Sequence, residues 1–294
     1  MHRHTMTPPV LDTLSLAGKV AIITGSGRNN GIGAGIARAL ARNGAAVAIN
    51  FVSDESASRA EETAQKIRDL GARVAVVRGS IETQDGAKNI VAESLKALDV
   101  DHVDILVNNA GVGASSPLLD VTPEQLQKEF GVNVFGALYM TQAAIKLGNM
   151  PRGGRIINIG SIVSRMGPAD MGVYATTKAA TDALMATWAL EVFTTRTYGA
   201  AVTRGNFADA SLQLGRSRGI TINTVAPGPV DTDIGNDIDN PDVTDDSFFV
   251  DMTRAEARTG TVDDIADAVL LLVSGLSRWI TAQFISVSGG INIL

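Results

Sequence analysis

The apolar positions along the chain fall into two alternating patterns. Short runs rich in Val and Ile, several of them apolar at nearly every position, are typical of strands covered on both faces. Longer Ala-rich stretches between them repeat apolar residues at helical spacing. The predicted strands are Lys19–Thr24, Ala46–Phe51, Arg73–Val77, Val103–Val107, Arg155–Ile159, Ile220–Val225 and Phe284–Val287. The predicted helices are Gly31–Asn43, Glu55–Leu70, Thr83–Leu98, Pro123–Asn149, Val173–Glu191 and Val262–Ser274.

This alternation predicts a single α/β fold. Strands separated by helices imply right-handed crossovers, and hence one doubly wound parallel sheet with helices on both faces. The length of 294 residues leaves room for two domains at about 150 residues each, but no linker or repeat divides the pattern. We expect one domain over residues 16–294, after a disordered tail of residues 1–15.

Composition excludes several classes of function. The chain carries 25 Lys+Arg against 31 Asp+Glu, a net charge of −6, and no basic runs, so no nucleic-acid or anionic-lipid partner is expected. The absence of Cys excludes disulfides, thiolate catalysis and Cys-ligated metals. Neither a secretory signal within Met1–Ala17 nor a membrane-spanning run is evident, which favours a soluble, cytoplasmic protein. Because His2 and His4 lie in the predicted tail, we expect no metal site.

The first predicted strand runs into a glycine-rich turn. Thr24-Gly25-Ser26-Gly27-Arg28-Asn29-Asn30-Gly31-Ile32-Gly33 precedes an Ala-rich helix. In doubly wound sheets, ligands bind beyond the carboxyl ends of the strands, and glycines let a pyrophosphate approach a helix N-terminus. Glycines also simply make turns, but this position in the first strand–helix unit favours a dinucleotide site.

Three further groups of residues follow later strands. Asn108-Asn109-Ala110-Gly111 follows the fourth strand, and Pro227-Gly228-Pro229-Val230-Asp231-Thr232 follows the sixth. Ser161 follows the fifth, with Tyr174 13 residues later and Lys178 four residues beyond. Helical positions four apart share a face, so the phenol and the ammonium can point into one cleft.

Together these motifs resemble the short-chain dehydrogenase/reductase family, from about Leu16 to the C-terminus. The resemblance rests on Thr24-Gly25…Gly31-Ile32-Gly33, Asn108-Asn109-Ala110-Gly111, Asn133, Ser161, Tyr174-Ala175-Thr176-Thr177-Lys178 and Pro227-Gly228. Within the family the chain looks most like the ketoreductase branch, which contains 3-oxoacyl-carrier-protein reductases and the fungal polyketide and naphthol reductases of secondary metabolism. The resemblance implies a Rossmann-like fold, an NAD(P)-dependent oxidoreductase acting on CH–OH and C=O groups, and a homotetramer or homodimer.

The resemblance assigns catalytic roles to four residues. Tyr174 exchanges a proton with the substrate oxygen, and Lys178 lowers its pKa from the ordinary value of about 10 and bonds the nicotinamide ribose. Ser161 holds the substrate oxygen, and Asn133 anchors a water of the proton relay. Each residue taken singly also has an ordinary structural interpretation. Tyr174 is then a packing residue and Lys178 a solvated charge, while Ser161 caps a turn and Asn133 is a buried polar bridge.

The cofactor assignment depends on the end of the second strand. NAD-specific relatives usually carry an acid there, whereas Phe51 stands at this position; Arg28 and Ser53 are suited to a 2′-phosphate. NADP(H) is therefore favoured over NAD(H), although Asp54 or Glu55 is an alternative partner for a free ribose. The resemblance implies cofactor contacts from Gly25, Arg28, Ile32, Gly33, Ser53, Ser80, Asn109, Tyr174, Lys178, Pro227, Val230 and Thr232.

The chain departs from the family pattern at three places. Five positions, Ser26–Asn30, separate Gly25 from Gly31 where the family usually has three, and Ser80 stands where an acid commonly contacts adenine. The 22 residues Val192–Gln213 interrupt an otherwise ordinary helix end. Val is encoded by GTN and Gln can be encoded by CAG, which match the two ends of a eukaryotic intron, and 22 codons preserve the reading frame. We therefore hypothesise a retained intron or a gene-model error. The alternative is a real surface loop, because the cost of loop closure rises slowly with length.

The stretch Thr232–Arg258 corresponds to the family's mobile substrate lid. Its residues Phe248 and Phe249 either contact an apolar or aromatic substrate or pack the lid onto the body. Its Asp residues lack the spacing of a Ca²⁺ loop, so a solvated acidic loop is expected.

These observations favour NADPH-dependent reduction of a ketone, with Tyr174 as general acid. Two alternatives stay open: a secondary alcohol dehydrogenase working oxidatively, and a non-catalytic dinucleotide-sensing or scaffold protein. The resemblance alone implies a polyketide-type or 3-oxoacyl substrate, and the acidic lid weakly disfavours an anionic carrier protein.

Overall fold

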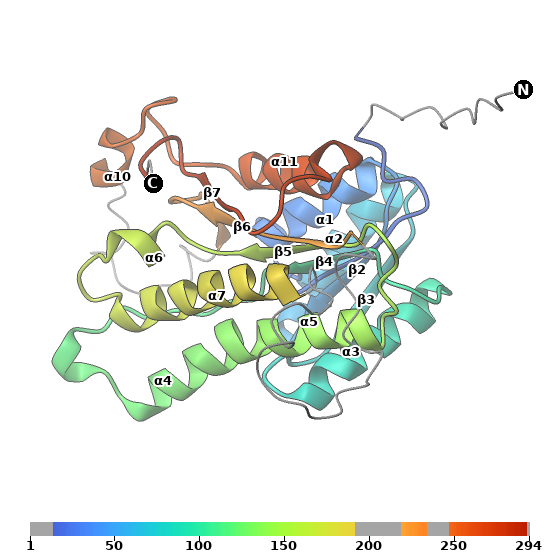
Figure 1. The fold of residues 1–294 in the computed structure, drawn as a ribbon, viewed down its shortest axis with the longest axis horizontal. Helices are drawn as coiled ribbons and strands as arrows, with labels where there is room; N and C mark the ends of the chain where they lie inside the picture. The colour runs from blue at the N-terminus through green and yellow to red at the C-terminus, as the bar shows by residue number, and fades with distance from the viewer. Residues whose placement is uncertain (1–13, 192–218, 234–246, 293–294) are drawn as a thin grey trace, which may run out of the picture.

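Seven parallel strands form the centre of the molecule. The computed structural model describes residues 14–191, 219–233 and 247–292. Within these residues the strands hydrogen-bond in the order β3-β2-β1-β4-β5-β6-β7 (Figure 1). Their bounds are β1 Val20–Ile23, β2 Ala46–Phe51, β3 Val74–Arg78, β4 Ile105–Asn108, β5 Arg155–Ile159, β6 Thr221–Pro227 and β7 Phe284–Val287. The predicted doubly wound, Rossmann-like sheet is confirmed.

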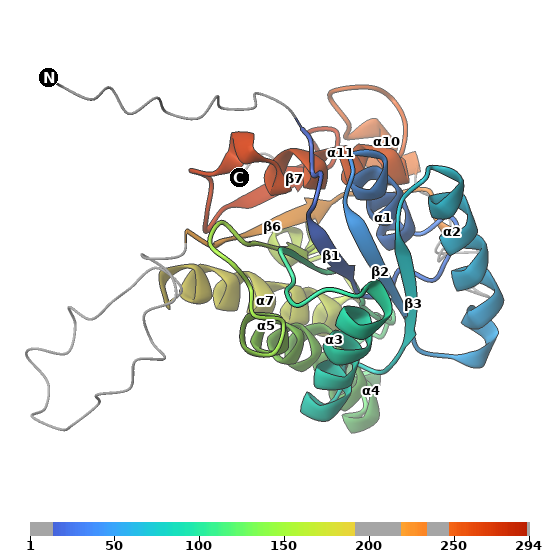
Figure 2. The ribbon, with the colours of Figure 1, turned by 90° about the vertical axis from the view of Figure 1, so that its right-hand side faces the viewer.

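Helices cover both faces of this sheet. One face carries α1 and α11, with α2 beside β3; the other carries α3, α5 and α7 (Figures 1 and 2). The helix bounds are α1 Ile32–Arg42, α2 Ala57–Asp69, α3 Gln84–Leu98, α4 Pro123–Phe130, α5 Ala137–Lys146, α6 Val163–Met166, α7 Gly172–Glu191, α10 Ser247–Asp251 and α11 Val262–Val273. Single 3₁₀ turns occur at Asp54–Ser56, Leu118–Asp120 and Gly275–Ser277.

Each central strand divides its side chains between two hydrophobic cores. Val20 and Ile22 of β1 belong to the core under α3 and α5, whereas Ala21 and Ile23 belong to the core under α1 and α11. All four side chains are buried. Successive residues of a strand point to opposite faces, so a strand covered on both sides is apolar throughout. This burial explains the continuous apolar runs of the sequence.

The predicted strands and helices match the structure to within two residues at most ends, and the main difference is the segment Pro123–Asn149. It is predicted as one helix, but α4 ends at Phe130, Gly131–Gly136 form a π-helical segment, and α5 follows. A π-helical turn accommodates an extra residue within a helix, and such turns are frequent at functional sites. Here the extra residue re-aims Asn133 towards neighbouring elements, as described below.

The start of α4 is as the sequence predicts. Thr122 accepts a hydrogen bond from Gln125 N, and Pro123 occupies the first turn, where its missing N–H costs nothing. A capping box at Thr261 and Asp264 begins α11 in a comparable way.

Two segments that the sequence singles out are not among the residues that the structure describes. Residues 1–13 of the predicted tail and all of Val192–Gln213 lie outside the described residues. Among the helices that are described, none is both long and apolar enough to span a bilayer.

Helices α1 and α11 pack closely against each other where Gly35 faces Val262. A Cβ at Gly35 would lie 3.1 Å from Val262 Cβ and 3.2 Å from its carbonyl oxygen. We expect Gly35→Leu to overpack this contact and lower the free energy of unfolding by about 1–3 kcal/mol in urea titrations. Gly275→Ala is the control, because a Cβ at Gly275 meets nothing within 4 Å. Equal stability of the two variants would contradict this account of the packing.

Candidate active site

The glycine-rich turn lies against the end of β4. Gly25 has φ +62°, and a Cβ there would lie 2.7 Å from Ala110 Cα. A Cβ at Gly33 would lie 2.5 Å from Asn109 Nδ2, which donates hydrogen bonds of 2.9 Å to the carbonyl oxygens of Thr24 and Gly25. The Asn109 side chain therefore holds the backbone of the turn in place. Gly25 and Gly33 are sterically required, because a Cβ at either position would be too close to a neighbouring atom.

The N-terminus of α1 fits an anionic group. Gly31 is its N-cap and supplies no side-chain hydrogen bond, and the first turn contains no acidic residue. The first N–H groups of a helix have no intrahelical partner and lie at the positive end of its dipole. With the close backbone approach at Gly33, these features fit the pyrophosphate of a dinucleotide. Ile32 is the first residue of this helix.

The acids that follow β2 are already engaged. Asp54 forms an ion pair of 2.6 Å with Arg78, which stands at the end of β3 and was not singled out from the sequence. Hydrogen bonds to its own backbone and to Ser53 lower the pKa of Glu55. Ser53 Oγ lies 2.9 Å from Ser56 Oγ. Phe51 ends β2, so no carboxylate stands at the strand terminus itself.

Ser80 takes part in a local turn after β3. Its hydroxyl accepts a hydrogen bond of 3.3 Å from Glu82 N and donates one of 3.4 Å to the Glu82 carboxylate. That carboxylate forms an ion pair of 2.7 Å with Lys128 of α4. Glu82 is therefore an acid in hydrogen-bond contact with Ser80, which stands where an acid is expected to contact adenine in the family.

Tyr174 and Lys178 lie one turn apart on α7, beside the end of β4. Lys178 Nζ is 5.5 Å from the centroid of the Tyr174 ring and donates a hydrogen bond of 2.8 Å to Ile159 O at the end of β5. The lysine is 6% exposed, so its charge is largely withdrawn from water. A Cβ at Gly113 would lie 2.6 Å from the Tyr174 ring. The predicted pairing of phenol and ammonium on one helical face is present.

The π-helical segment brings Asn133 to the same place. Its Nδ2 donates to Val112 O at 2.7 Å and to Thr177 Oγ1 at 2.9 Å, while its Oδ1 accepts from Val112 N at 2.9 Å. A Cβ at Gly111 would lie 3.4 Å from both Asn133 Oδ1 and Lys178 Nζ. The structure thus gathers Asn133, Tyr174 and Lys178 around the loop that follows β4.

Two threonines of α7, which sequence reasoning missed, connect it to this segment. Thr177 Oγ1 donates to Tyr174 O at 2.7 Å while it accepts from Asn133. Thr181 Oγ1 lies 2.8 Å from Thr177 O and 3.3 Å from Asn133 O, and both oxygens accept from it. Both threonines are buried. The sequence signal for these two residues was their spacing, because Thr177 and Thr181 are four positions apart and so share a face of the helix.

Ser161 follows β5 and is positioned through its neighbours. Its Oγ accepts a hydrogen bond of 3.3 Å from Val163 N. Ser164 Oγ contacts two acceptors, Ser161 O at 2.9 Å and Asp182 Oδ2 at 2.8 Å. Burial raises the pKa of Asp182, four residues after Lys178 on α7. The i, i+4 spacing from Lys178 was a signal that the sequence offered for this acid.

The segment after β6 is anchored by Gly260. Val230 forms a parallel bridge with Gly260, and Asp231 N donates to Gly260 O at 2.9 Å. Pro227 ends β6, and the half-buried Thr232 follows the bridge. These residues lie at the same carboxyl-end edge as the glycine-rich turn.

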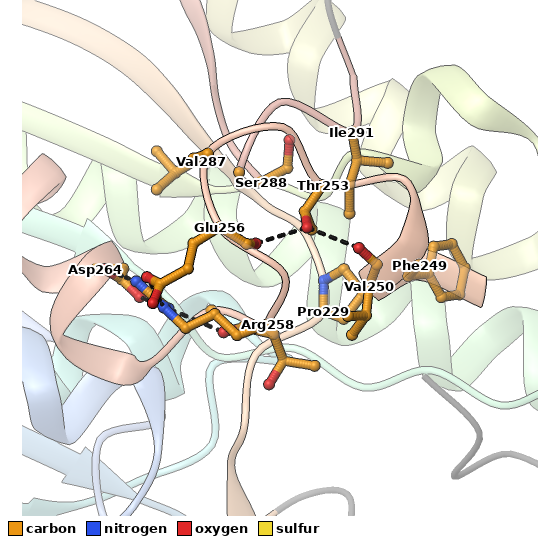
Figure 3. A pocket seen from close by; sticks show the side chains of 14 residues that line it. Pro229, Phe249, Val250, Thr253, Glu256, Arg258, Asp264, Val287, Ser288 and Ile291 are labelled. Atoms are coloured by element: carbon orange, nitrogen blue, oxygen red, sulfur yellow. Dashed lines mark hydrogen bonds and ion pairs between the residues drawn. The ribbon is translucent and has the colours of Figure 1, made fainter. Parts of the chain in front are cut away.

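The described part of the predicted lid encloses a cavity of about 200 Å³ (Figure 3). Phe249 and Val250 of α10 line it together with Pro229 and Ile291. Phe248 is 66% exposed and packs edge-on against Phe249, with ring centroids 5.5 Å apart.

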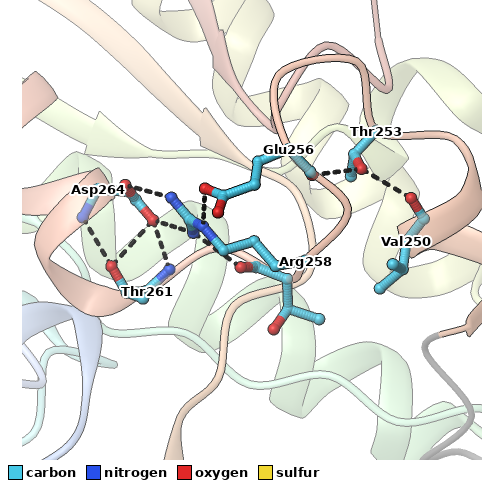
Figure 4. Close-up of polar contacts among 7 residues, drawn as sticks. Val250, Thr253, Glu256, Arg258, Thr261 and Asp264 are labelled. Atoms are coloured by element: carbon cyan, nitrogen blue, oxygen red, sulfur yellow. Dashed lines mark hydrogen bonds and ion pairs between the residues drawn. The ribbon is translucent and has the colours of Figure 1, made fainter.

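Polar contacts around Arg258 hold the C-terminal end of the predicted lid (Figure 4). Arg258 forms ion pairs of 2.7 Å with Asp264 and 2.8 Å with Glu256. Hydrogen bonds from Arg258 and Thr261 lower the pKa of Asp264.

Residues 234–246, with most of the predicted acidic loop, lie outside the described residues. Where the chain is described, no group of three His, Cys, Asp or Glu residues is placed to hold a metal ion.

Comparison with known proteins shows the family. A model of short chain dehydrogenases matches residues 19–208, and one described as enoyl-(acyl carrier protein) reductase matches residues 201–292. The short-chain dehydrogenase/reductase FrzI of Cladobotryum sp is 35% identical, over 97% of this chain and 99% of that protein. The 3-oxoacyl-[acyl-carrier-protein] reductase FabG of Chlamydia pneumoniae is 31% identical (95% and 99%), and the trihydroxynaphthalene reductase of Colletotrichum orbiculare 30% identical (96% and 92%).

Solved structures of similar proteins indicate the same family. The angucycline C-6 ketoreductase LanV with bound NADP superposes with a TM-score of 0.79 at 31% identity, covering 94% of this chain and 96% of that one. A blue fluorescent protein from a metagenomic library, in complex with NADPH, gives a TM-score of 0.79 at 32% identity (95% and 100%). The chain therefore belongs to the short-chain dehydrogenase/reductase family, and the resemblance found in the sequence is confirmed. It is an NAD(P)-dependent oxidoreductase.

The contacts of Thr177 lead to a testable expectation. Thr177→Val keeps the side-chain shape but removes one of the two acceptors of Asn133 Nδ2, and an unpaired buried N–H typically costs about 1–3 kcal/mol. We expect kcat to fall about tenfold with little change in the KM of the cofactor, because Asn133 then holds the loop after β4 less firmly against Tyr174 and Lys178. Thr177→Ser should restore kcat.

The matched control is Thr176→Val on the exposed face of the same helix, where the hydroxyl donates to Gly172 O. A Thr177→Val variant with lowered thermal stability but unchanged kcat and pH profile would show that Thr177 is merely structural.

Proposed function

We propose that this protein is an NADPH-dependent ketoreductase in which Tyr174 is the general acid. The observation that carries the proposal is the buried Lys178 ammonium, 5.5 Å from the Tyr174 ring centroid, beside Asn133 and Gly111. A positive charge beside the phenol is placed to stabilise the negative charge that develops on the phenol oxygen as its proton is transferred. The combination is difficult to explain by packing alone.

The proposed reaction adds a hydride and a proton across a carbonyl group. A bound nicotinamide supplies the hydride. Ser161 holds the carbonyl oxygen, and the Tyr174 hydroxyl donates its proton to that oxygen as the alcohol forms. Lys178 stabilises the resulting phenolate and bonds the ribose, and Asn133 anchors the water through which the proton is replaced. The same residues serve alcohol oxidation in reverse, so the direction follows the cellular cofactor ratio.

The glycine-rich turn and the segment after β6 form the proposed cofactor site. Its residues are Gly25, Arg28, Ile32, Gly33, Ser53, Ser80, Asn109, Tyr174, Lys178, Pro227, Val230 and Thr232. NADP(H) is favoured because Phe51 ends β2 and because Asp54 is paired with Arg78. The NADP(H) bound by two similar solved proteins supports the same choice.

The proposed substrate is a polyketide-type or 3-oxoacyl ketone. Relatives named as 3-oxoacyl and trihydroxynaphthalene reductases support this class, and the exposed Phe248 offers an apolar surface at the lid. The proposed working form is a cytoplasmic homotetramer or homodimer, which light scattering tests. Assays of the protein with and without Val192–Gln213 test whether that segment belongs to the active enzyme.

Tyr174→Phe tests the catalytic role. Removing the hydroxyl leaves no group to deliver the proton, so we expect NADPH consumption on a panel of ketones to fall by about 10²- to 10⁴-fold. NADPH binding, followed by fluorescence, should stay close to that of the wild type. Substantial residual turnover would remove Tyr174 from the acid role. A wild-type protein that binds NADPH but reduces no ketone would favour the dinucleotide-sensing alternative.

Arg28→Ala tests the choice of cofactor. A charge-assisted contact with a 2′-phosphate contributes about 1.5–3 kcal/mol, so its loss should weaken NADPH binding about 10- to 100-fold. NADH binding should be nearly unchanged, since NADH carries no such phosphate. Comparative titration measures both affinities. Equal binding of NADH and NADPH by the wild-type protein would contradict the assignment.

A further inference from the structure

The enlarged glycine-rich turn is tied to two helices. Asn29 O accepts a hydrogen bond of 2.9 Å from Arg38 of α1. The Asn29 side chain donates to Glu62 and accepts from Lys66, both of α2 and both at 2.9 Å. The outer part of the turn is therefore not a loose excursion, because backbone and side chain are both held.

The next residue, Asn30, connects the turn to the segment after β6. Asn30 N donates to Asp233 Oδ2 at 3.0 Å, and Asp233 N donates to Asn30 O at 3.2 Å. The two residues are 203 positions apart in the sequence. Asp233 comes two residues after Asp231, whose backbone is fixed on Gly260. Two held segments thus meet through a pair of hydrogen bonds, which we call the Asn30–Asp233 bridge.

The strand order shows what this bridge crosses. β1 precedes the glycine-rich turn and β6 precedes Asp233, and between them in the sheet lie β4 and β5. At about 4.8 Å per strand, the bridge joins segments whose strands are about 14 Å apart. Tyr174, Lys178 and the loop after β4 lie at the ends of the intervening strands. The bridge therefore joins the two segments that flank the proposed dinucleotide site between α1 and these residues.

We propose that the Asn30–Asp233 bridge is a strap across the cofactor groove that slows release of the bound dinucleotide. The proposal rests on the proposed cofactor site. Both ends of the strap come from elements that flank that site, and its two hydrogen bonds must break before the segments separate. Asn30 belongs to the five-residue turn that departs from the three-residue pattern of the family. The strap gives this departure a function.

A competing explanation makes the opposite prediction. In that explanation the Asp233 carboxylate is a stand-in for a phosphate and blocks an amide of the anion site. However, the second hydrogen bond, from Asp233 N to Asn30 O, contributes nothing to such mimicry. Asn30 also precedes the N-cap Gly31, so the N–H groups of the first turn of α1 are not involved. The contact is therefore better explained as a connection between two segments.

The rate of NADPH release measures the strap directly. NADPH fluorescence in a stopped-flow chase, with excess NADP⁺ as the displacing ligand, gives the dissociation rate without any turnover. We expect Asp233→Ala to release NADPH about tenfold faster, because a hydrogen bond to the carboxylate is lost. Asp233→Asn keeps an acceptor oxygen and should release NADPH within about threefold of the wild-type rate.

Asp231→Ala is the matched control, since it removes the same charge two residues away while its backbone contact to Gly260 stays. It should leave the release rate within about twofold of wild type. Release from Asp233→Ala at the wild-type rate, or tighter NADPH binding by both Asp233 variants, would overturn the strap. Failure of the wild-type protein to bind NADPH at all would instead contradict the proposed cofactor site.

Discussion

The parallel pairing of β1 with β2 on one side and β4 on the other is the constraint on which the site depends. Because every strand of the described sheet runs the same way, all carboxyl ends meet at one edge. The strand order reverses beside β1, so the loops after β1 and β4 leave in opposite directions and open a crevice between them. The glycine-rich turn and the loop around Gly111 occupy this crevice, and close approach at Gly25 and Gly33 keeps it narrow.

Within that frame, buried hydrogen bonds align the proposed catalytic groups. Asn133 joins the loop after β4 to α7, and Thr177 and Thr181 complete the connection. Buried polar groups are costly when unpaired, so a network in which each contact satisfies two groups has few alternative arrangements. The π-helical segment is the local distortion that allows this alignment, since an undistorted helix over the same residues would direct Asn133 elsewhere.

The cofactor region combines rigid and more exposed parts. Ser26 is fully buried and holds the start of the turn, whereas Asn29 and Asn30 make their contacts at the surface. Exposed hydrogen bonds contribute less to stability than buried ones and open more readily. This difference suits the proposed cofactor site, which must hold a dinucleotide during reaction and exchange it afterwards.

The sequence by itself determined the fold class, most of the elements and the candidate catalytic residues. These follow from local information: apolar runs mark buried strands, and the spacing of Tyr174 and Lys178 places them on one helical face. Only the tertiary structure decided that Asn133 sits in a π-helical turn, that Asp54 is taken by Arg78, and that Asn30 meets Asp233. Each of these depends on contacts between segments far apart in the chain. Neither periodicity nor residue spacing encodes such contacts, because they arise only when the strands order themselves in the sheet.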